Sequence, residues 1–145
     1  ANYSDGLTDL PLPQQLDHFR KHGKTASFLC VRPNLSYHLV RTAPDGCVTS
    51  IEEFSRANIR INAGYFILRR EIFDHIRDGE ELVQEPFQRL VRSSRLTAYE
   101  YDGFWQSMDT FKDRQQLEEI YARGNAPWEI WKTLGAPASY AGVGA

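Results

Sequence analysis

Two aspartates at opposite ends of the sequence stand in settings that could hold a divalent metal ion. Asp5 lies in a turn-like Tyr-Ser-Asp-Gly run at 3–6, and Asp109 follows the aromatic run 104–105. Both positions are typical of a strand end followed by a loop, which is where α/β proteins bind ligands. Magnesium takes one or two carboxylates together with waters and substrate phosphates. The pair therefore predicts a magnesium site that serves phosphate chemistry.

The run Asn62-Ala63-Gly64 lies inside an apolar stretch with strong strand character. Glycine weakens a strand unless another group must approach the backbone closely. A bulge or tight packing is one explanation, and a ligand lying over the strand is the other. In the second case Asn62 could offer both a hydrogen-bond donor and an acceptor to a sugar hydroxyl.

Two further acidic positions have both functional and structural explanations. Glu52 and Glu53 end the run 48–51, and adjacent side chains of a strand alternate faces, so at most one of them can point into a shared site. A solvated strand end is the alternative for both. Gln84-Glu85-Pro86 is typical of a helix N-terminus, where the helix dipole favours a carboxylate such as Glu85. This structural explanation is sufficient without a functional role for Glu85.

Several chemistries find no support in the sequence. The histidines, at 18, 22, 38 and 75, have no spacing that builds a metal site or a nucleophilic triad, and no serine or cysteine nucleophile motif is present. No glycine-rich phosphate loop of either common kind occurs. Covalent catalysis is therefore not indicated. A phosphate-transfer site in these residues would lack the loop that binds the nucleotide phosphates.

The composition indicates one compact soluble domain with a real core, since the 145 residues are 41% hydrophobic and 25% charged. The formal charge of −2 and the scattered basic residues argue against nucleic-acid binding. Cys30 and Cys47 lie in apolar runs and are expected to be reduced core residues. No membrane-spanning run or signal peptide is seen, which predicts a cytoplasmic protein. The sequence begins inside a motif, as if cut from something longer.

Strand and helix patterns alternate along the chain. Helices are expected at 14–22, at 70–77, from about Pro86 with Phe87, Leu90 and Val91 inward, and at 111–123 with Leu117, Ile120 and Tyr121 at helical spacing. Strands are expected at 25–32, 61–68 and 96–101, with a hairpin formed by 37–42 and 47–54 around Pro44-Asp45-Gly46. The pattern predicts an α/β fold with a parallel or mixed sheet flanked by helices, over residues 1–134, followed by a flexible tail, 135–145.

Four segments in register resemble the C-terminal part of the sugar-phosphate nucleotidyltransferases, and most of all their glucose-1-phosphate cytidylyltransferase branch. They are Tyr-Ser-Asp-Gly-Leu-Thr-Asp at 3–9, Ile-Asn-Ala-Gly-Tyr-Phe at 61–66, Gln-Glu-Pro at 84–86 and Gly-Phe-Trp-Gln-Ser-Met-Asp-Thr at 103–110. Each segment is weak alone, but four in the same order are specific. The resemblance extends from Asn2 to about Trp131.

The resemblance implies a Rossmann-like nucleotidyltransferase fold whose full-length enzyme joins a nucleoside triphosphate, CTP, to a sugar 1-phosphate, glucose 1-phosphate, and releases pyrophosphate. It implies that Asp5 and Asp109 are catalytic and bind Mg²⁺, and that the substrate-binding residues are Tyr3, Glu52, Asn62 and Gly64. The partners are then the two substrates, with no nucleic acid or membrane, and the full-length enzyme is expected to be a homo-oligomer.

The sequence also departs from the family pattern. Ser4 and Ser36 replace glycines, while Glu53 and Phe54 replace a lysine and a proline. A carboxylate in place of that lysine would repel a sugar phosphate, unless Arg56 or Arg60 compensates. The family's glycine-rich nucleotide loop, with its arginine and lysine, is not in these residues.

Three hypotheses follow from the sequence. The chain is the sugar-binding half of a nucleotidyltransferase, inactive when isolated; or a non-catalytic sugar-phosphate-binding or regulatory module; or an interaction domain with no ligand.

Overall fold

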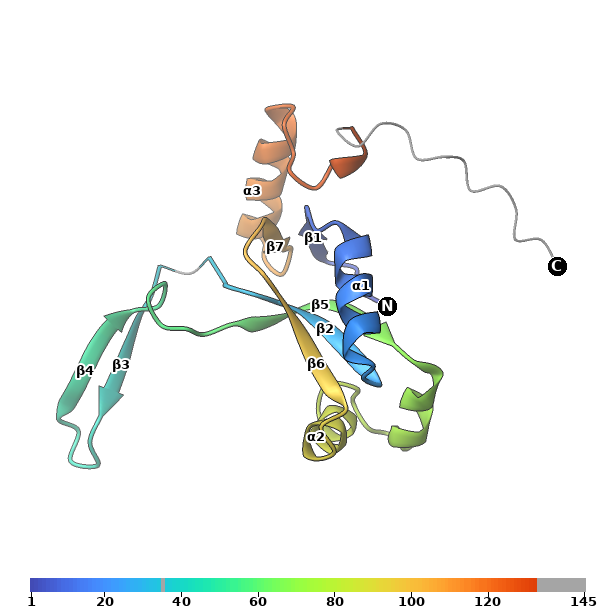
Figure 1. The fold of residues 1–145 in the computed structure, drawn as a ribbon. Coiled ribbons are helices and arrows are strands. Elements are labelled where there is room, and N and C mark those ends of the chain that lie inside the picture. Colours follow the sequence, from blue (N-terminus) through green and yellow to red (C-terminus); the bar gives the residue numbers. More distant parts are fainter. Residues whose placement is uncertain (35, 133–145) are drawn as a thin grey trace.

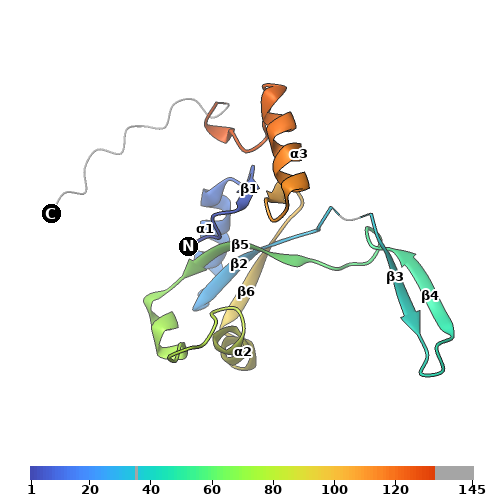
Figure 2. The same ribbon diagram turned by 180° about the vertical axis from the view of Figure 1, so that it is seen from behind.

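The computed structural model describes residues 1–34 and 36–132, and the expected tail, 135–145, lies outside the described residues. The elements follow in the order β1 (Gly6–Thr8), α1 (Leu12–His22), β2 (Ala26–Val31), β3 (His38–Thr42), β4 (Val48–Glu53), β5 (Ile61–Leu68), the 3₁₀ helix η1 (Arg70–His75), α2 (Glu85–Arg92), β6 (Leu96–Tyr101), β7 (Trp105–Ser107), α3 (Phe111–Ala122) and the 3₁₀ helix η2 (Ile130–Lys132). Figures 1 and 2 show them from opposite sides.

A mixed sheet in the order β5-β2-β6 forms the centre of the molecule. Strand β2 pairs antiparallel with β5 and parallel with β6, so the predicted mixed sheet between helices is confirmed. Side chains of a strand alternate between faces, and the core therefore divides in two. On one face Ala26 and Phe66 pack with Ile72 of η1 and with Phe87 and Leu90 of α2.

The opposite face of the sheet buries Leu29, Val31 and Ala63 against Leu10, which lies in the segment between β1 and α1. Tyr65, Tyr99 and Trp105 pack around this second cluster. It ties the short β1–β7 pair to the central sheet, and this face carries the candidate site.

Helix α1 ends where the sequence predicts but begins at Leu12, two residues before the expected start at residue 14. Pro13 stands in the first turn, where its missing N–H is not needed, and Gly23 takes the left-handed conformation at the C-terminal end with φ of 61°. Phe19 and Gln15 are its buried residues, and the Gln15 side-chain amide donates to the Tyr65 carbonyl at 3.3 Å.

Strand β5 carries an irregularity where the sequence placed glycine in a strand. The register against β2 shifts between Phe28 and Cys30, and Gly64 adopts a φ of 76°. A Cβ at Gly64 would lie 2.5 Å from the Tyr3 ring, closer than real Cβ contacts come. Bulge and tight packing, the structural explanation for Asn62-Ala63-Gly64, are therefore confirmed.

The predicted hairpin forms around Pro44-Asp45-Gly46. The Asp45 carboxylate accepts from the Cys47 amide at 3.0 Å, and Gly46 supplies a φ of 85°. This bond holds the pKa of the Asp45 carboxyl below its usual value. Strands β3 and β4 form a two-stranded sheet of their own, which projects away from the central sheet in Figures 1 and 2.

Some expectations for single elements were wrong. The helix expected at 70–77 is the shorter 3₁₀ helix η1. Val91 is 54% exposed, because it follows the buried Leu90 by one residue and so points away from the inner face of α2, and Tyr121 of α3 is 60% exposed. Cys30 and Cys47 are both free, but Cys47 is exposed beside the hairpin turn, so it is not a core residue.

Candidate active site

The β1–β7 pair brings the two ends of the sequence together. The strands run antiparallel, with Gly6 opposite Ser107, Leu7 opposite Gln106 and Thr8 opposite Trp105. The Met108 amide extends this ladder by donating to the Asp5 carbonyl at 2.8 Å. Asp109 is the next residue, so Asp5 and Asp109 lie at the same end of the β1–β7 pair. Both side chains are exposed there.

The route by which the two aspartate-bearing segments come to the same end of a strand pair differs from the one expected. Each was expected to end a strand at one edge of a sheet, but Asp5 precedes β1 whereas Asp109 follows β7. An antiparallel pair places the start of one strand beside the end of the other. The juxtaposition therefore comes from a separate two-stranded sheet.

Hydrogen bonds from buried or half-buried groups fix this pair against β5. The Tyr65 hydroxyl donates to the Gly6 carbonyl at 2.8 Å, and the Trp105 indole donates to the Ala63 carbonyl at 3.0 Å. The Tyr3 amide donates to the Gly64 carbonyl at 2.8 Å. Burial raises the pKa of Tyr65, which keeps its hydroxyl a donor.

Three of the expected substrate-binding residues lie around the bulge of β5. Asn62 is exposed, and its side-chain oxygen accepts from the Gly64 amide at 2.9 Å. Its side-chain nitrogen can still donate to a ligand. Tyr3 packs over Gly64 and makes an edge contact with Phe66, with ring centroids 5.3 Å apart. Sugar binding by these residues stays a prediction.

Glu52 lies on a different element from the other candidates. It is on β4, opposite Leu39, and its nearest cation is Arg41 at 3.9 Å. In the described chain, every hydrogen bond and ion pair of residues 38–53 has both partners within 37–57. The hairpin reaches the rest of the molecule through its two connecting segments (Figure 1).

The two arginines considered as substitutes for the missing lysine differ in availability. Arg60 has a side chain only 10% exposed and pairs with Glu100 at 3.1 Å and Asp102 at 2.9 Å. It also donates to the Tyr101 carbonyl, so its role is structural. Arg56 pairs with Glu53 at 3.2 Å but is 79% exposed, which leaves it able to reach a bound anion.

The donor set fits magnesium better than a metal caged by protein ligands. Within residues 1–34 and 36–132, no group of three or more His, Cys, Asp and Glu side chains could hold a metal ion. Two exposed carboxylates at one end of a strand pair match the usual magnesium site, which completes its coordination with water and substrate phosphates. Metal binding by Asp5 and Asp109 stays a prediction.

The sequence reading assigned no role to Asp9 and Tyr101, which meet at the other end of the β1–β7 pair. The Tyr101 hydroxyl donates to Asp9 Oδ1 at 2.6 Å, and the Phe104 amide donates to the same oxygen at 2.8 Å. Burial and this carboxylate raise the pKa of Tyr101 well above its usual value. The one sign of Asp9 in the sequence was that a second aspartate follows Asp5 by four residues.

The chain resembles known enzymes over most of its length, although no family model matches it. The glucose-1-phosphate cytidylyltransferase of Salmonella typhimurium is 34% identical over 90% of this chain and 51% of its own length. The mannose-1-phosphate guanylyltransferase catalytic subunit beta of Drosophila pseudoobscura is 27% identical over 76% of this chain and 31% of its own. The chain is a homologue of the sugar-phosphate nucleotidyltransferases. It spans about half the length of the cytidylyltransferases it matches.

A solved structure supports the nucleotidyltransferase fold. A Bacillus anthracis protein assigned as a glucose-1-phosphate thymidylyltransferase superposes with a TM-score of 0.52 over 77% of this chain and 49% of that one, at 14% identity. At such low identity the likeness concerns the fold alone. None of the helices within the described residues has the length and apolar character needed to cross a membrane.

Two cavities of this nucleotidyltransferase homologue have neither Asp5 nor Asp109 in their walls. A groove of about 1070 Å³ runs between α1, β5 and η2, and its apolar walls include Leu12, Leu16, Phe66, Ile67 and Trp131. The Ala1 carbonyl accepts from the Phe66 amide at 2.7 Å at its edge.

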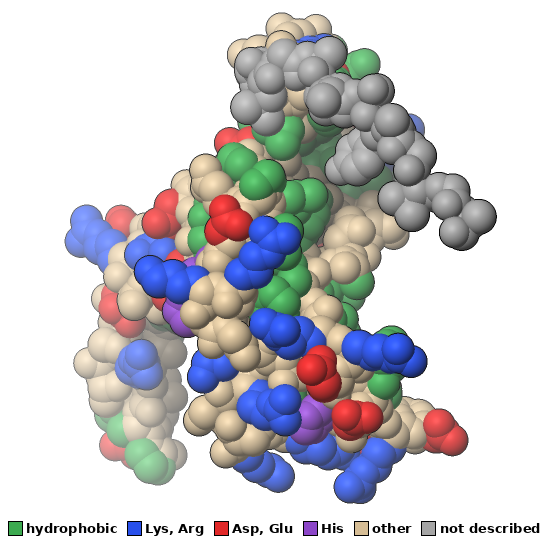
Figure 3. Space-filling model, turned by 45° about the vertical axis from the view of Figure 1, so that its right-hand side comes forward, with side chains coloured by type: hydrophobic (Ala, Val, Ile, Leu, Met, Phe, Trp, Pro, Cys, Tyr) green, Lys and Arg blue, Asp and Glu red, His purple; other side chains and the backbone are tan. Residues whose placement is uncertain are grey.

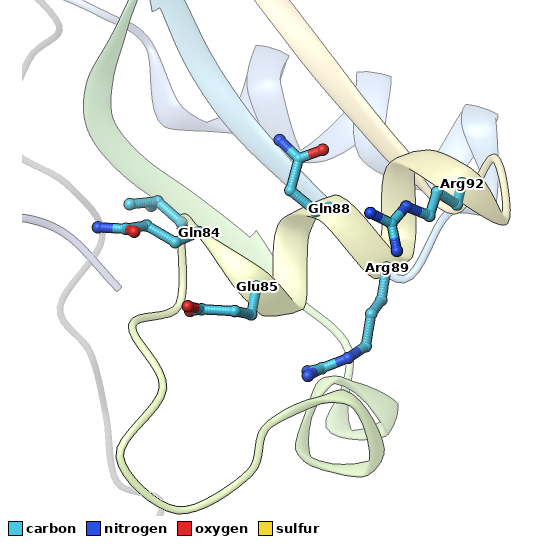
Figure 4. Close-up of a pocket in the computed structure, with 6 residues that line it drawn as sticks. Gln84, Glu85, Gln88, Arg89 and Arg92 are labelled. Carbon is cyan, nitrogen blue, oxygen red and sulfur yellow. The ribbon is translucent and has the colours of Figure 1, made fainter.

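The second cavity, of about 480 Å³, is polar and lies on α2, lined by Gln84, Glu85, Gln88, Arg89 and Arg92 (Figure 4). Helix α2 and η1 lie at the end of the molecule opposite to β1 and β7 (Figure 1). Lys and Arg side chains also gather over that end in Figure 3. The sequence motif Gln84-Glu85-Pro86 therefore starts a helix remote from the paired aspartates, as its helix-entry explanation requires.

Proposed function

We propose that this chain is the sugar-phosphate-binding part of an enzyme that joins CTP to glucose 1-phosphate and releases pyrophosphate. The observation that carries the proposal is the juxtaposition of Asp5 and Asp109, 104 positions apart in sequence, at one end of the β1–β7 pair. Similarity to a cytidylyltransferase of Salmonella typhimurium supports CTP and glucose 1-phosphate as the substrates.

The chemistry needs little from the protein besides position and charge. The sugar-phosphate oxygen attacks the α-phosphorus in line, the bond from that phosphorus to the leaving pyrophosphate breaks, and negative charge spreads over the transferring group. Magnesium, when bound, neutralises part of this charge. Asp5 and Asp109 would hold the ion, while Asn62 and the backbone beside Gly64 would orient the sugar.

The apolar groove between α1, β5 and η2 supports the proposal that the active enzyme contains more than these residues. Exposed apolar grooves often mark the places where another protein segment binds. We expect the missing nucleotide-binding part to cover this groove. The isolated chain should then associate at high concentration, and light scattering that shows a monomer throughout would count against this.

The paired aspartates give the direct test. In a full-length enzyme that carries this chain, Asp5→Asn and Asp109→Asn should each lower kcat by roughly 100-fold or more, since the metal stabilises charge that develops in the transition state. Sugar-phosphate binding should change much less. Asp74→Asn changes an exposed aspartate of η1, at the end of the molecule opposite to β1 and β7, so it is the matched control and should retain activity.

Unchanged turnover in Asp109→Asn would refute the shared metal site and leave Asp109 as a residue that precedes α3. The isolated chain should synthesise no sugar nucleotide, because the residues that would cradle the triphosphate are not in it. Steady pyrophosphate release by the purified chain from CTP and glucose 1-phosphate would contradict that expectation.

A non-catalytic sugar-phosphate-binding module is the second candidate, and Glu53 favours it. This carboxylate stands where the family pattern that the sequence resembles has a lysine, and in the described chain it forms an ion pair with the exposed Arg56. Glu53→Lys should raise the affinity for glucose 1-phosphate, measured by calorimetry, whereas Glu118→Lys on α3 should not. Equal effects of the two substitutions would show that the hairpin base does not meet the sugar phosphate.

A further inference from the structure

Asp9 connects three segments of the chain with one carboxylate oxygen. Its Oδ1 accepts from the Tyr101 hydroxyl, at the end of β6, and from the Phe104 amide, just before β7. The Asp9 amide donates back to the Phe104 carbonyl at 3.2 Å. The same carbonyl accepts from the Thr8 hydroxyl at 2.7 Å. Asp9 therefore clamps both sides of the β6–β7 turn onto the end of β1.

The turn itself is built to keep Tyr101 in place. Residues 102 and 103 are Asp-Gly, and a Cβ at Gly103 would lie 2.3 Å from the Tyr101 ring carbon and hydroxyl. The Tyr101 ring stacks on Tyr99 with centroids 6.5 Å apart, which further limits its movement. The hydroxyl is thus held where the Asp9 carboxylate accepts its hydrogen bond.

The β1–β7 pair needs such a clamp because it is short. Each strand contributes three paired residues, and an isolated two-stranded sheet is marginally stable in water. A slip of one residue would turn every side chain of β7 to the other face and would change which residue of the 107–109 segment lies beside Asp5. The bond from Trp105 to Ala63 holds β7 against β5. The bond from the Phe104 amide to Asp9 fixes which residue of β1 lies beside the first residue of β7.

We infer that Asp9 is a positioning residue that sets the register of β7 on β1 and thereby fixes where Asp109 lies relative to Asp5, with Tyr101 as its partner. The inference deepens the proposed function and rests on it for the meaning of the paired aspartates. The register itself can be measured without any metal or substrate.

The first experiment follows amide hydrogen exchange in the whole chain by NMR. In Asp9→Ala, exchange of the Met108 amide, which bonds to Asp5, should speed up at least tenfold relative to the Leu29 amide in β2. Asp9→Asn keeps an acceptor oxygen and should restore most of the protection. Equal acceleration of the Met108 and Leu29 amides would mean that Asp9 contributes only general stability, and the inference would be overturned.

Tyr101→Phe and Tyr99→Phe form a matched pair on β6. Tyr101→Phe removes the hydroxyl bonded to Asp9 and should speed Met108 exchange several-fold. Tyr99→Phe removes a hydroxyl bonded to Gln14 and should leave it unchanged. In absorbance titrations, Asp9→Asn should lower the pKa of Tyr101 toward its ordinary value, because the neighbouring negative charge is gone.

A metal probe separates the inference from the proposed function. Mn²⁺ should broaden the amide signals near Asp5 and Asp109 together in the unsubstituted chain, and several-fold more Mn²⁺ should be needed in Asp9→Ala. If Mn²⁺ broadens neither segment in the unsubstituted chain, the metal site fails while the exchange data still decide the register. If Asp9→Ala responds to Mn²⁺ as the unsubstituted chain does, the positioning role is wrong.

Discussion

The β1–β7 pair and the β3–β4 hairpin are both two-stranded antiparallel sheets, yet different parts of the chain hold them. The strands of the hairpin are joined by a local turn, and its bonds stay within residues 37–57 of the described chain. The strands of the β1–β7 pair come from opposite ends of the sequence, and Tyr65, Trp105, Asp9 and Tyr101 bond them to the rest of the fold. The first is therefore set by local sequence and the second by tertiary packing.

Because of this difference, the candidate site residues lie on two regions that are held in place to different extents, the β1–β7 pair and the β3–β4 hairpin. The aspartates expected to bind metal flank the strand pair that hydrogen bonds of Tyr65 and Trp105 hold against the central sheet. Glu52 and Glu53 sit on the exposed hairpin, which can shift relative to that sheet with few bonds broken. Substitutions in the two parts should accordingly have different costs, and three comparisons test this.

The largest difference is expected between two glycines that both have positive φ. Gly64, in the β5 bulge, has φ of 76° and the Tyr3 ring against it, whereas Gly46, in the hairpin turn, has φ of 85° and open space. Gly64→Ala should lower the free energy of unfolding by about 2–4 kcal/mol, since it adds a steric clash to left-handed strain. Gly46→Ala should cost only about 1 kcal/mol.

Urea denaturation of both glycine variants measures these costs. A Gly64→Ala protein no less stable than Gly46→Ala would show that Tyr3 and the segment before β1 move aside freely. The β5 bulge and the hairpin turn would then tolerate an added side chain equally well.

A smaller difference is expected between two valines. Val31 of β2 is 2% exposed and Val40 of β3 is 54% exposed. Val31→Ala should lower the free energy of unfolding by about 2–3 kcal/mol through lost burial and a cavity. Val40→Ala should change it by less than about 0.5 kcal/mol. Thermal unfolding followed by circular dichroism is sufficient, and a large loss in Val40→Ala would reveal that this side of the hairpin is covered in solution.

The smallest effect concerns two ion pairs. Glu80 pairs with Arg89 of α2, and this bond lowers the pKa of Glu80 to about 2 from its ordinary value of 4.5. The pair therefore stabilises the fold above about pH 4.5, and that contribution is lost as the pH falls toward 2. In the hairpin, Arg41 and Glu52 lie 3.9 Å apart with mostly exposed side chains and should contribute little.

Denaturation of Glu80→Gln and Glu52→Gln across this pH range provides the check. Glu80→Gln should be less stable than the unsubstituted chain at pH 6, and the gap should shrink as the pH falls from 4.5 toward 2. Glu52→Gln should match the unsubstituted chain at every pH. A gap for Glu80→Gln that does not depend on pH would show that the carboxylate charge is not what stabilises the contact.

Local patterns were sufficient to predict most elements. The apolar runs of β5 and β6, the Pro44-Asp45-Gly46 turn and the ends of α1 follow from strand periodicity, turn geometry and helix caps. The inward orientation of Val91 was a misreading of helix geometry, since Val91 directly follows the buried Leu90. The exposure of Cys47 was mispredicted because burial depends on which neighbouring element packs against a side chain. The glycine in β5 was recognised as unusual, but only the structure identified the Tyr3 ring that lies against it.

The sequence by itself determined the kinds of group available for chemistry and their order along the chain: two separated aspartates, a strand interrupted at Asn62-Ala63-Gly64, and paired glutamates at a hairpin strand end. The tertiary structure decided which of these meet. Asp5 and Asp109 become neighbours because β1 and β7 pair antiparallel, and Asp9 and Tyr101 become partners because β6 ends beside β1. Long-range pairing depends on burial against the central sheet, and no local pattern of residues encodes it.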